Sequence, residues 1–507
     1  MSADILGILI GVFSVKNIFI AAGGVFVGIV FGALPGFTAA MGVAILLPLT
    51  FGMDPARGLI LLGSLFGGAM YGGSIAAILI NTPGTPSAAA TVLDGYPMAK
   101  KGLASRALRE SVFASFLGGI FGVTMLLLFA PPLARISLMF GPPEYFLLAL
   151  FALTIIATLS EKAMIKGFLA GVLGLIISTI GMDPLLGFPR FSFGLADLTD
   201  GIELVPALIG LFSIPEVLEI IHQHRKDVHQ GIPNLKNIKI GFPPWKHIVS
   251  FIPIYVRSSA IGTWIGILPG AGGSIASFMA YNETKRASKR PELFGTGIPE
   301  GVAAAESANN AMSGGALIPM LTLGVPGDSV AAIMMGGLMI HGLQPGAELF
   351  TRNAHIVYTF ILALYLANIL MLLYGTYFAP YFTVLTNTPR HILAVSVMLL
   401  TVMGSFALRG NMFDVYVMIA FGILGYLMRT HGFPVIPTVL GIILGTQAEK
   451  GLNGTIAISY GENIIWFMLS RPLSLILILL TVLSVAFPIY RHVRGRKGGS
   501  GADEPGD

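Results

Sequence analysis

The chain has 507 residues, of which 54% are hydrophobic and only 11% are charged, with a net charge of +5 at pH 7. A soluble domain carries about 25% charged residues, so this composition excludes an ordinary soluble protein. The absence of cysteine excludes disulfides, thiolate catalysis and cysteine-ligated metals. The basic residues lie in a few loops, so no nucleic-acid partner is expected. The sequence predicts an all-α polytopic protein of the lipid bilayer.

Long apolar segments predict the membrane spans, because a helix needs about 20 apolar residues to cross a bilayer, and we expect about 11–12 full spans. The first half gives Ile18–Leu34, Gly58–Ile80, Leu108–Ala130, Glu144–Leu159, Ala163–Ile180 and Glu203–Ile221. The second half gives Ile248–Leu268, Val302–Leu323, His355–Tyr377, His391–Phe406, Phe413–Met428 and Val435–Gly445. A further helix is expected at about Ile464–Pro488.

Two shorter apolar segments, Thr38–Phe51 and Gly272–Met279, each follow a Leu-Pro-Gly sequence. They are too short to span the bilayer alone, and we expect them to be arms of re-entrant hairpins beside broken helices. The predicted organisation is a first membrane repeat (1–221), a basic cytoplasmic linker (222–247), a second repeat (248–450), an extra C-terminal transmembrane helix (451–490) and a cytoplasmic tail (491–507).

Two phrases rich in helix-breaking residues occur once in each half. Gly32–Gly36 (GALPG) recurs as Gly266–Gly270 (GILPG), and Thr82–Thr85 (TPGT) recurs as Val325–Asp328 (VPGD). The prolines of the two pairs are 234 and 243 residues apart. Paired breaks in corresponding positions of two halves point to the binding site of a transporter.

The charges of equivalent loops differ between the halves. Segment 51–57 has one arginine, whereas its counterpart 282–299 has four basic residues. Segment 100–109 is strongly basic, whereas its counterpart 341–355 contains only Arg352. Because basic loops stay in the cytoplasm, equivalent loops are expected on opposite sides of the membrane. The two repeats are therefore predicted to have inverted topology.

Pro-Gly breaks at membrane depth leave backbone groups without helical partners, and the exposed helix N-termini attract anions. Hydroxyl, amide and backbone N–H groups there could bind a carboxylate, although any one break could also be a simple kink. The candidate substrate-binding residues lie around the breaks and on a polar stripe of the second half: Gly36, Thr38, Asn81, Thr82, Gly84, Thr85, Gly270, Gly272, Ser274, Asn309, Asn310, Gly327 and Ser329.

Asp328, Asn81 and Glu306 are the candidate coupling-ion residues. A carboxylate in an apolar stretch is a functional-site hypothesis by default, but Asp328 is equally suited to cap a helix over Ser329–Ile340. Glu306 belongs either to a cavity-facing stripe or to an interhelical hydrogen-bond network. If the coupling ion is Na⁺, we expect it near Asp328; no other metal or cofactor is expected. No pair of catalytic groups is evident, so the chain is not expected to be an enzyme.

Four segments, Gly32–Thr50, Tyr71–Gly102, Phe140–Tyr145 and Gly324–Ser329, resemble the large membrane subunit of tripartite tricarboxylate transporters, the TctA family. The resemblance implies a secondary transporter of the bacterial inner membrane that imports tricarboxylates or dicarboxylates with a Na⁺ or proton gradient. It also implies two partners, a small membrane subunit (TctB-like) and a periplasmic solute-binding protein (TctC-like). An elevator-type motion is expected. A passive anion channel of the same architecture is the alternative.

Overall fold

The computed structural model describes residues 5–34, 36–159, 164–183, 187–222, 240–379, 381–382 and 390–498. Pro35, most of the predicted linker and the end of the predicted tail lie outside these residues. The described chain is almost entirely helical, and eight of its described helices are long and apolar enough to cross a membrane. The prediction of an all-α polytopic membrane protein is confirmed.

The helices pack into two compact units, and each unit takes segments from both halves of the sequence. The larger unit contains Met1–Leu138 and Glu203–Leu427, and the smaller unit contains Met139–Ile202 and Met428–Asp507. This division by packing does not coincide with the predicted division into two consecutive repeats. The two units are described separately below.

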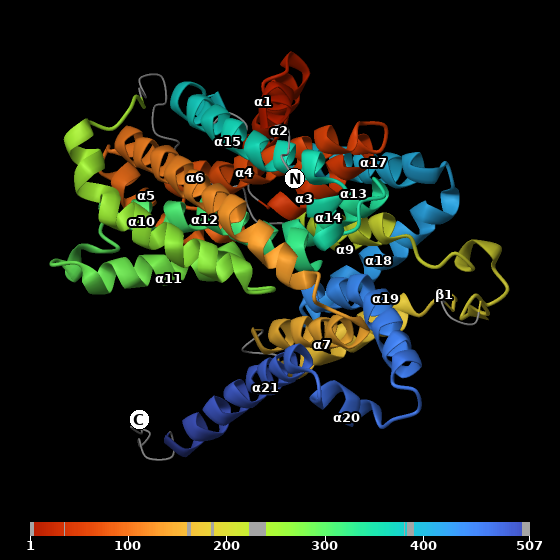
Figure 1. The fold of residues 1–507 in the computed structure, drawn as a ribbon. Coiled ribbons are helices and arrows are strands. Elements are labelled where there is room, and N and C mark those ends of the chain that lie inside the picture. The colour runs from red at the N-terminus through yellow and green to blue at the C-terminus, as the bar shows by residue number, and fades with distance from the viewer. Residues whose placement is uncertain are drawn as a thin grey trace, which may run out of the picture. The chain divides into compact units, whose positions relative to one another are not determined.

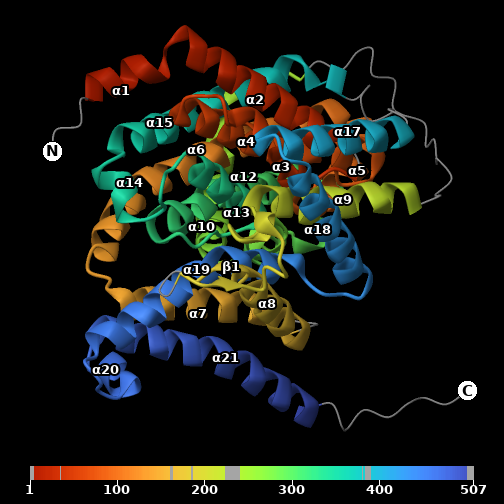
Figure 2. The ribbon, with the colours of Figure 1, turned by 90° about the vertical axis from the view of Figure 1, so that its right-hand side faces the viewer.

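In the larger unit, the first half of the sequence contributes α1 (Ile5–Val12), α2 (Val15–Ala33), α3 (Ala39–Leu46), η1 (Leu47–Thr50), α4 (Pro55–Ile80), η2 (Pro86–Ala88), α5 (Ala89–Lys100), α6 (Ala104–Ser137) and α9 (Leu204–His222). The second half contributes α10 (Trp245–Ile267), α11 (Gly272–Ala287), η5 (Pro291–Leu293), α12 (Pro299–Leu323), α13 (Ser329–Ile340), α14 (Ala347–Thr351), α15 (Ala354–Tyr377), α17 (Arg390–Arg409) and most of α18 (Met412–Thr430). α12 lies between α6 and α10 (Figure 1), and α9 lies beside α17 (Figure 2).

The smaller unit contains α7 (Pro142–Leu159), α8 (Met164–Ser178), η3 (Ala196–Leu198), α19 (Val435–Ile458), α20 (Ile464–Leu469) and α21 (Pro472–Gly498). Its two short strands, β1 (Gly181–Met182) and β2 (Pro189–Arg190), pair antiparallel with Gly181 opposite Arg190. α19 packs on α7 and α8, and α21 packs on α7.

Glycines allow the helices that precede the breaks to approach their neighbours closely. A Cβ atom added at Gly32 of α2 would lie 2.2 Å from the carbonyl oxygen of Ala69 in α4. A Cβ added at Gly266 of α10 would lie 2.4 Å from the carbonyl oxygen of Met312 in α12. The two glycines are 234 residues apart and their partners 243, the same offsets as in the repeated phrases. The sequence duplication therefore recurs as duplicated packing; the opposite membrane orientation of the halves stays a prediction.

A second set of glycine contacts joins the two halves of the sequence. In the larger unit, a Cβ at Gly210 of α9 would lie 2.3 Å from the Met418 carbonyl oxygen of α18. In the smaller unit, a Cβ at Gly174 of α8 would lie 2.1 Å from the Thr438 carbonyl oxygen of α19. Each unit thus depends on a helix from one half packed against helices from the other.

Several observed helix bounds differ from the expected ones. The span predicted at Val435–Gly445 and the short segment predicted at Gly272–Met279 continue as helix to Ile458 and Ala287, because hydropathy marks the apolar region and polar residues do not end a helix. The single helix predicted at Ile464–Pro488 is two helices, α20 and α21. Pro472 cannot donate a backbone hydrogen bond, so the chain breaks before it and α21 starts there.

Candidate substrate site at the paired helix breaks

The two Leu-Pro-Gly breaks have the same backbone geometry. The C-cap residue directly after α2 is Leu34, with φ −82° and ψ 117°, and that after α10 is Leu268, with φ −77° and ψ 119°. Each is followed by a glycine with positive φ, 88° at Gly36 and 77° at Gly270. Side chains rarely adopt this conformation, so glycine is required at both positions.

The two Pro-Gly breaks are also alike, because both helices that precede them end in a left-handed residue. The C-cap residue of α4 is Asn81, with φ 56°, and that of α12 is Gly324, with φ 69°. Asparagine tolerates this conformation better than most other side chains. The backbone conformation therefore explains an asparagine at position 81 without any role in ion binding. Asn81 and the following Thr82 are exposed, whereas Gly324 is buried.

Gly84 and Gly327 hold the Pro-Gly breaks against the Leu-Pro-Gly helices. A Cβ added at Gly84 would lie 1.9 Å from the Gly32 carbonyl oxygen, and one at Gly327 would lie 2.1 Å from the Gly266 carbonyl oxygen. The amides of three predicted substrate-binding glycines already donate to backbone carbonyls: Gly84 to Gly73 (3.1 Å), Gly270 to Gly327 (2.8 Å) and Gly327 to Ala316 (3.4 Å). In this structure, contrary to the expectation of free donors, these amides join the breaks to their neighbours.

Two of the helices that follow the breaks are capped by their own side chains. The Met41 amide at the start of α3 donates to Thr38 Oγ1 at 3.1 Å. The Ala331 amide at the start of α13 donates to Asp328 Oδ1 at 2.8 Å. α13 begins at Ser329 and ends at Ile340, so the predicted helix and the capping role of Asp328 are confirmed. Asp328 is buried, and Ser329, directly after it, is partly buried.

The other two helices lack such a cap, and their starts lie against each other. Neither Ala271 before α11 nor Thr85 before η2 makes a side-chain capping bond. A Cβ added at Gly273 would lie 2.7 Å from the Cβ of Ser87, so α11 meets η2 directly. The hydroxyl groups of Thr85 and Ser87 are hydrogen-bonded at 3.0 Å. We call Thr85, Ser87, Gly272, Gly273 and Ser274 the crossed tips.

The crossed tips combine chemical groups that suit an anion. The first amides of a helix have no intrahelical acceptor, and the helix dipole adds partial positive charge there. α11 presents the amides of Gly272, Gly273 and Ser274 at such a start, beside the two hydroxyl groups of η2. Three of these residues were in the expected set, and the structure adds Ser87 and Gly273. No local signal distinguishes those two, because their contact depends on tertiary packing.

The predicted polar stripe of α12 divides into different environments. Asn309 Nδ2 donates to the Met70 carbonyl oxygen of α4 at 3.0 Å. Asn310 is only 1% exposed, and neither polar atom of its side chain has a hydrogen-bond partner among the described residues. The Glu306 carboxylate accepts hydrogen bonds from the Thr91 and Ser115 hydroxyl groups. For Glu306 and Asn309, the hydrogen-bond-network interpretation therefore fits the structure.

The predicted coupling-ion residues are not gathered at one point. Gly327, next to Asp328, bonds to Ala316 of α12. Ala316 lies ten residues beyond Glu306 on that helix, about 15 Å at 1.5 Å per residue. Asp328 and Glu306 are therefore too far apart to ligate one ion in this structure. Among the described residues, no group of three or more His, Asp or Glu is placed to hold a metal ion.

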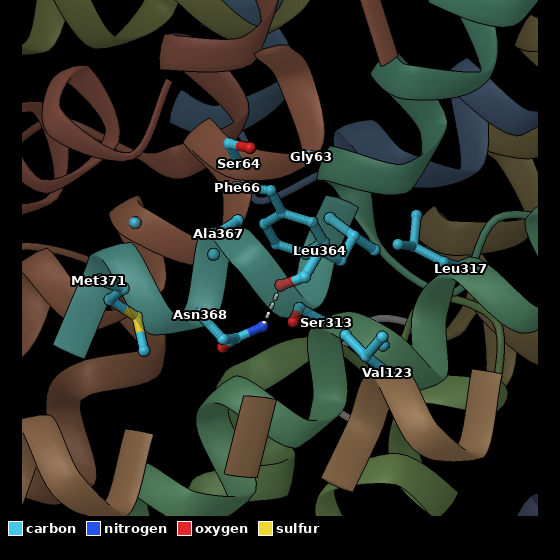
Figure 3. Close-up of a pocket in the computed structure, with 13 residues that line it drawn as sticks. Gly63, Ser64, Phe66, Val123, Ser313, Leu317, Leu364, Ala367, Asn368 and Met371 are labelled. Carbon is cyan, nitrogen blue, oxygen red and sulfur yellow. Dashed lines mark hydrogen bonds between the residues drawn. The ribbon is translucent and has the colours of Figure 1, made fainter. Parts of the chain in front are cut away.

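A pocket lies elsewhere in the larger unit, between α4, α6, α12 and α15 (Figure 3). The space between its lining atoms is about 350 Å³, a volume that includes open solvent. Its polar lining consists of Ser64, Ser313 and Asn368, and Asn368 Nδ2 donates to the Leu364 carbonyl oxygen at 2.8 Å. No residue of the crossed tips lines it. All its lining residues lie within helices rather than at a helix start, so it offers no free first-turn amides to a carboxylate.

Comparison with known proteins agrees with the sequence resemblance. The chain is 34% identical over 94% of its length to a protein of Agrobacterium vitis described as an uncharacterized 52.8 kDa protein in the TAR-I ttuC′ 3′ region, and the match covers 93% of that relative. A second uncharacterized Agrobacterium vitis protein, of the TAR-II ttuC′ 3′ region, is 31% identical over 46% of the chain and 97% of its own length. No solved structure matches the chain. Residues 18–440 match the tripartite tricarboxylate transporter TctA family, and the chain therefore belongs to this family.

Proposed function

We propose that the protein is the large transmembrane subunit of a binding-protein-dependent secondary transporter that imports organic carboxylates, tricarboxylates or dicarboxylates, into bacteria. Membership of the TctA family supports this, and so do the eight candidate spans. The inner membrane is the expected location. Na⁺ or protons supply the driving gradient. A small membrane subunit and a periplasmic solute-binding protein that delivers the substrate complete the system.

The observation that carries the proposal is the meeting of two uncapped helix starts at the crossed tips. Amides of α11 and the hydroxyl groups of Thr85 and Ser87 face this place from two sides. The two hydroxyl groups are bonded to each other, and we propose that a carboxylate replaces this bond with hydrogen bonds to itself. In α3 and α13, a first-turn amide already donates to the side chain of Thr38 or Asp328, so these two helix starts are less suited to bind a carboxylate. Because this site uses no full positive charge, a carboxylate can be released again after transport.

The broken helices also suggest how the substrate changes sides. Two inverted repeats that meet at such breaks can alternate their access by a rigid movement of one group of helices. We propose an elevator-type movement in which the crossed tips travel with the substrate. A passive channel of the same architecture would need no such movement and could not accumulate its substrate.

Transport in proteoliposomes tests this function. The full chain is reconstituted with the small membrane subunit and the binding protein, and uptake of labelled succinate, malate and citrate is followed under an imposed Na⁺ or proton gradient. We expect accumulation above the external concentration for the carboxylate that the binding protein holds. Equilibration without accumulation would instead favour the passive channel.

The site is tested in the same assay with Ser87→Ala. A hydrogen bond to a charged group is worth about 1.5–3 kcal/mol, so we expect substrate affinity to fall by about tenfold or more. Ser329→Ala is the comparison, since Ser329 follows the capped break of α13 and is expected to matter less. An equal or larger effect of Ser329→Ala would move the site away from the crossed tips.

A further inference from the structure

Within the described part of the chain, Glu306 is a carboxylate without a cationic partner. Its side chain is 0% exposed, and Ser115 Oγ donates to Glu306 Oε2 at 2.9 Å, while Thr91 Oγ1 donates to Oε1. Among the described residues, no Lys, Arg or His forms an ion pair with it. An isolated buried charge is so costly that such a group takes up a proton instead.

The partners of Glu306 differ from those of the other buried carboxylates. Glu144 is held by the guanidinium of Arg471 besides the Ser474 hydroxyl, and Asp94 accepts three backbone amides besides the Tyr281 hydroxyl. Each of these two carboxylates thus has partners, a guanidinium or amides, that can only donate hydrogen bonds. The hydroxyl groups of Thr91 and Ser115 can donate or accept. They can satisfy an ionised Glu306 by donating twice. They can satisfy a protonated one when Thr91 or Ser115 accepts its hydrogen.

The titratable groups on the surrounding helices leave Glu306 without a charged partner. From α4, the phenol of Tyr71 lies close enough to interact electrostatically with Glu306; it is buried, and its oxygen has no hydrogen-bond partner among the described residues. From α6, Glu110 is bonded to His247 and Tyr255 of α10. From α5, Asp94 is bonded to Tyr281 of α11. Among the described residues, the hydroxyl groups that donate to the Glu306 carboxylate, those of Thr91 and Ser115, are both neutral.

Glu306 is connected to the crossed tips through α5. Thr91, its hydrogen-bond partner, lies four residues after Ser87 on the chain that runs from η2 into α5. Three residues after Glu306 on α12, the Asn309 side chain bonds to Met70 of α4, and the Ser87 hydroxyl contacts the Met70 sulfur at 3.8 Å. A change in the Glu306–Thr91 bond therefore acts on the segment that carries one tip.

We propose that Glu306 binds the coupling proton of the transporter. This proposal rests on the proposed transport function. The proton adds to the Glu306 carboxylate on one side of the membrane and leaves it as a hydrated proton on the other. The hydrogen bond with Thr91 reverses its direction between the two states. The driving ion is then a proton, bound away from Asp328.

Infrared difference spectra of the purified full chain test the protonation directly. Stepwise pH changes are expected to produce a carbonyl band of a buried carboxylic acid that is present in the wild type and in Glu300→Gln, and absent in Glu306→Gln. Glu300 is the matched control because it lies in the first turn of the same helix. If Glu306→Gln does not fold, Thr91→Val replaces it, and a shift of the band then supports the proposal. No titrating band, an unshifted band in Thr91→Val, or one that persists in Glu306→Gln, overturns it.

Transport provides the second readout, with succinate, malate and citrate as probes and a proton gradient in the absence of Na⁺. We expect accumulation by the wild type and Glu300→Gln, and its loss in Glu306→Gln. Undiminished accumulation by Glu306→Gln overturns the proposal. If the wild type shows the band but carries no carboxylate, the proposed function fails and the proton site stands. If accumulation follows Na⁺ alone and no band titrates, the proton site fails and the function stands.

Discussion

Asp328 caps helix α13, and its charge is also predicted to bind a coupling ion. Its side chain caps α13 and is buried, which accounts for a carboxylate at this break. The corresponding residue of the first half, Thr85, makes no capping bond at all. The two tips are therefore chemically unequal, as their sequences indicate. The predicted binding of a cation by the Asp328 charge can be tested separately from the capping role.

Substitutions at Asp328 separate the two roles, because asparagine caps helices about as well as aspartate and alanine does not. We expect Asp328→Ala to lower the free energy of unfolding by about 1 kcal/mol and Asp328→Asn to leave it nearly unchanged. Thermal unfolding of the purified variants measures this. Loss of coupled uptake in a fully folded Asp328→Asn protein would show that the charge does more than cap, and would support the predicted coupling site.

Single residues also mark the limit of what the sequence predicts. The breaks at Gly36, Gly270 and Gly327 follow from local chemistry, because proline and glycine disrupt helices wherever they occur. The hydrogen bond from the Gly327 amide to the Ala316 carbonyl oxygen cannot be predicted from the local sequence, and neither can the contact of Gly273 with Ser87. Such contacts join residues of different helices, and only the folded chain determines them.

At the scale of elements, an ion pair joins α21 to the rest of the smaller unit. Glu144 in the first turn of α7 is 0% exposed and accepts two hydrogen bonds from Arg471, at 2.7 and 3.0 Å. Ser474 Oγ donates to the same carboxylate at 2.6 Å. Arg471 lies at the break between α20 and α21, so this contact determines where α21 packs on α7. Hydropathy alone predicted one continuous helix there.

Removal of Arg471 tests this contact. Arg471→Ala leaves the buried Glu144 carboxylate without its cation. Because the Arg471 side chain is 35% exposed, we expect a loss of about 1.5–3 kcal/mol, the range for hydrogen bonds to a charged group, rather than that of a fully buried pair. Arg352→Ala is the control, because Arg352 pairs with Glu348 on the surface, with side chains 78% and 54% exposed. We expect at most about 0.5 kcal/mol there. Thermal unfolding and limited proteolysis measure both, and equal stability of the two variants would contradict the assigned role.

At the scale of the whole molecule, the sequence predicts helices better than their grouping. Apolar length is a local property, so most spans could be located within several residues, whereas the end of α19 and the break between α20 and α21 could not. The partition into two units depends on pairs such as Gly174 with Thr438 and Gly210 with Met418, which lie in different halves. Their partners cannot be read from hydropathy, because every apolar helix face is an acceptable neighbour in a membrane.

The inverted orientation of the repeats is tested by labelling from either side of the membrane. A single cysteine at Lys289 is expected to react only from the cytoplasm, and one at Pro55 only from outside. The native chain contains no cysteine, so no background labelling has to be removed. Labelling of both positions from the same face would rule out the inverted arrangement.

The exchange of helices between the halves has a consequence for how the protein is made. α8 ends at Ser178, but α19, against which Gly174 packs, begins at Val435. At about 5–20 residues per second, the ribosome needs roughly 10–50 s to make the residues between them. During that interval the Gly174 face of α8 is in place before its partner α19 exists. The packing of α8 on α19 is therefore completed long after α8 itself has been made, so membrane insertion of α8 and its final packing are separate stages of biogenesis.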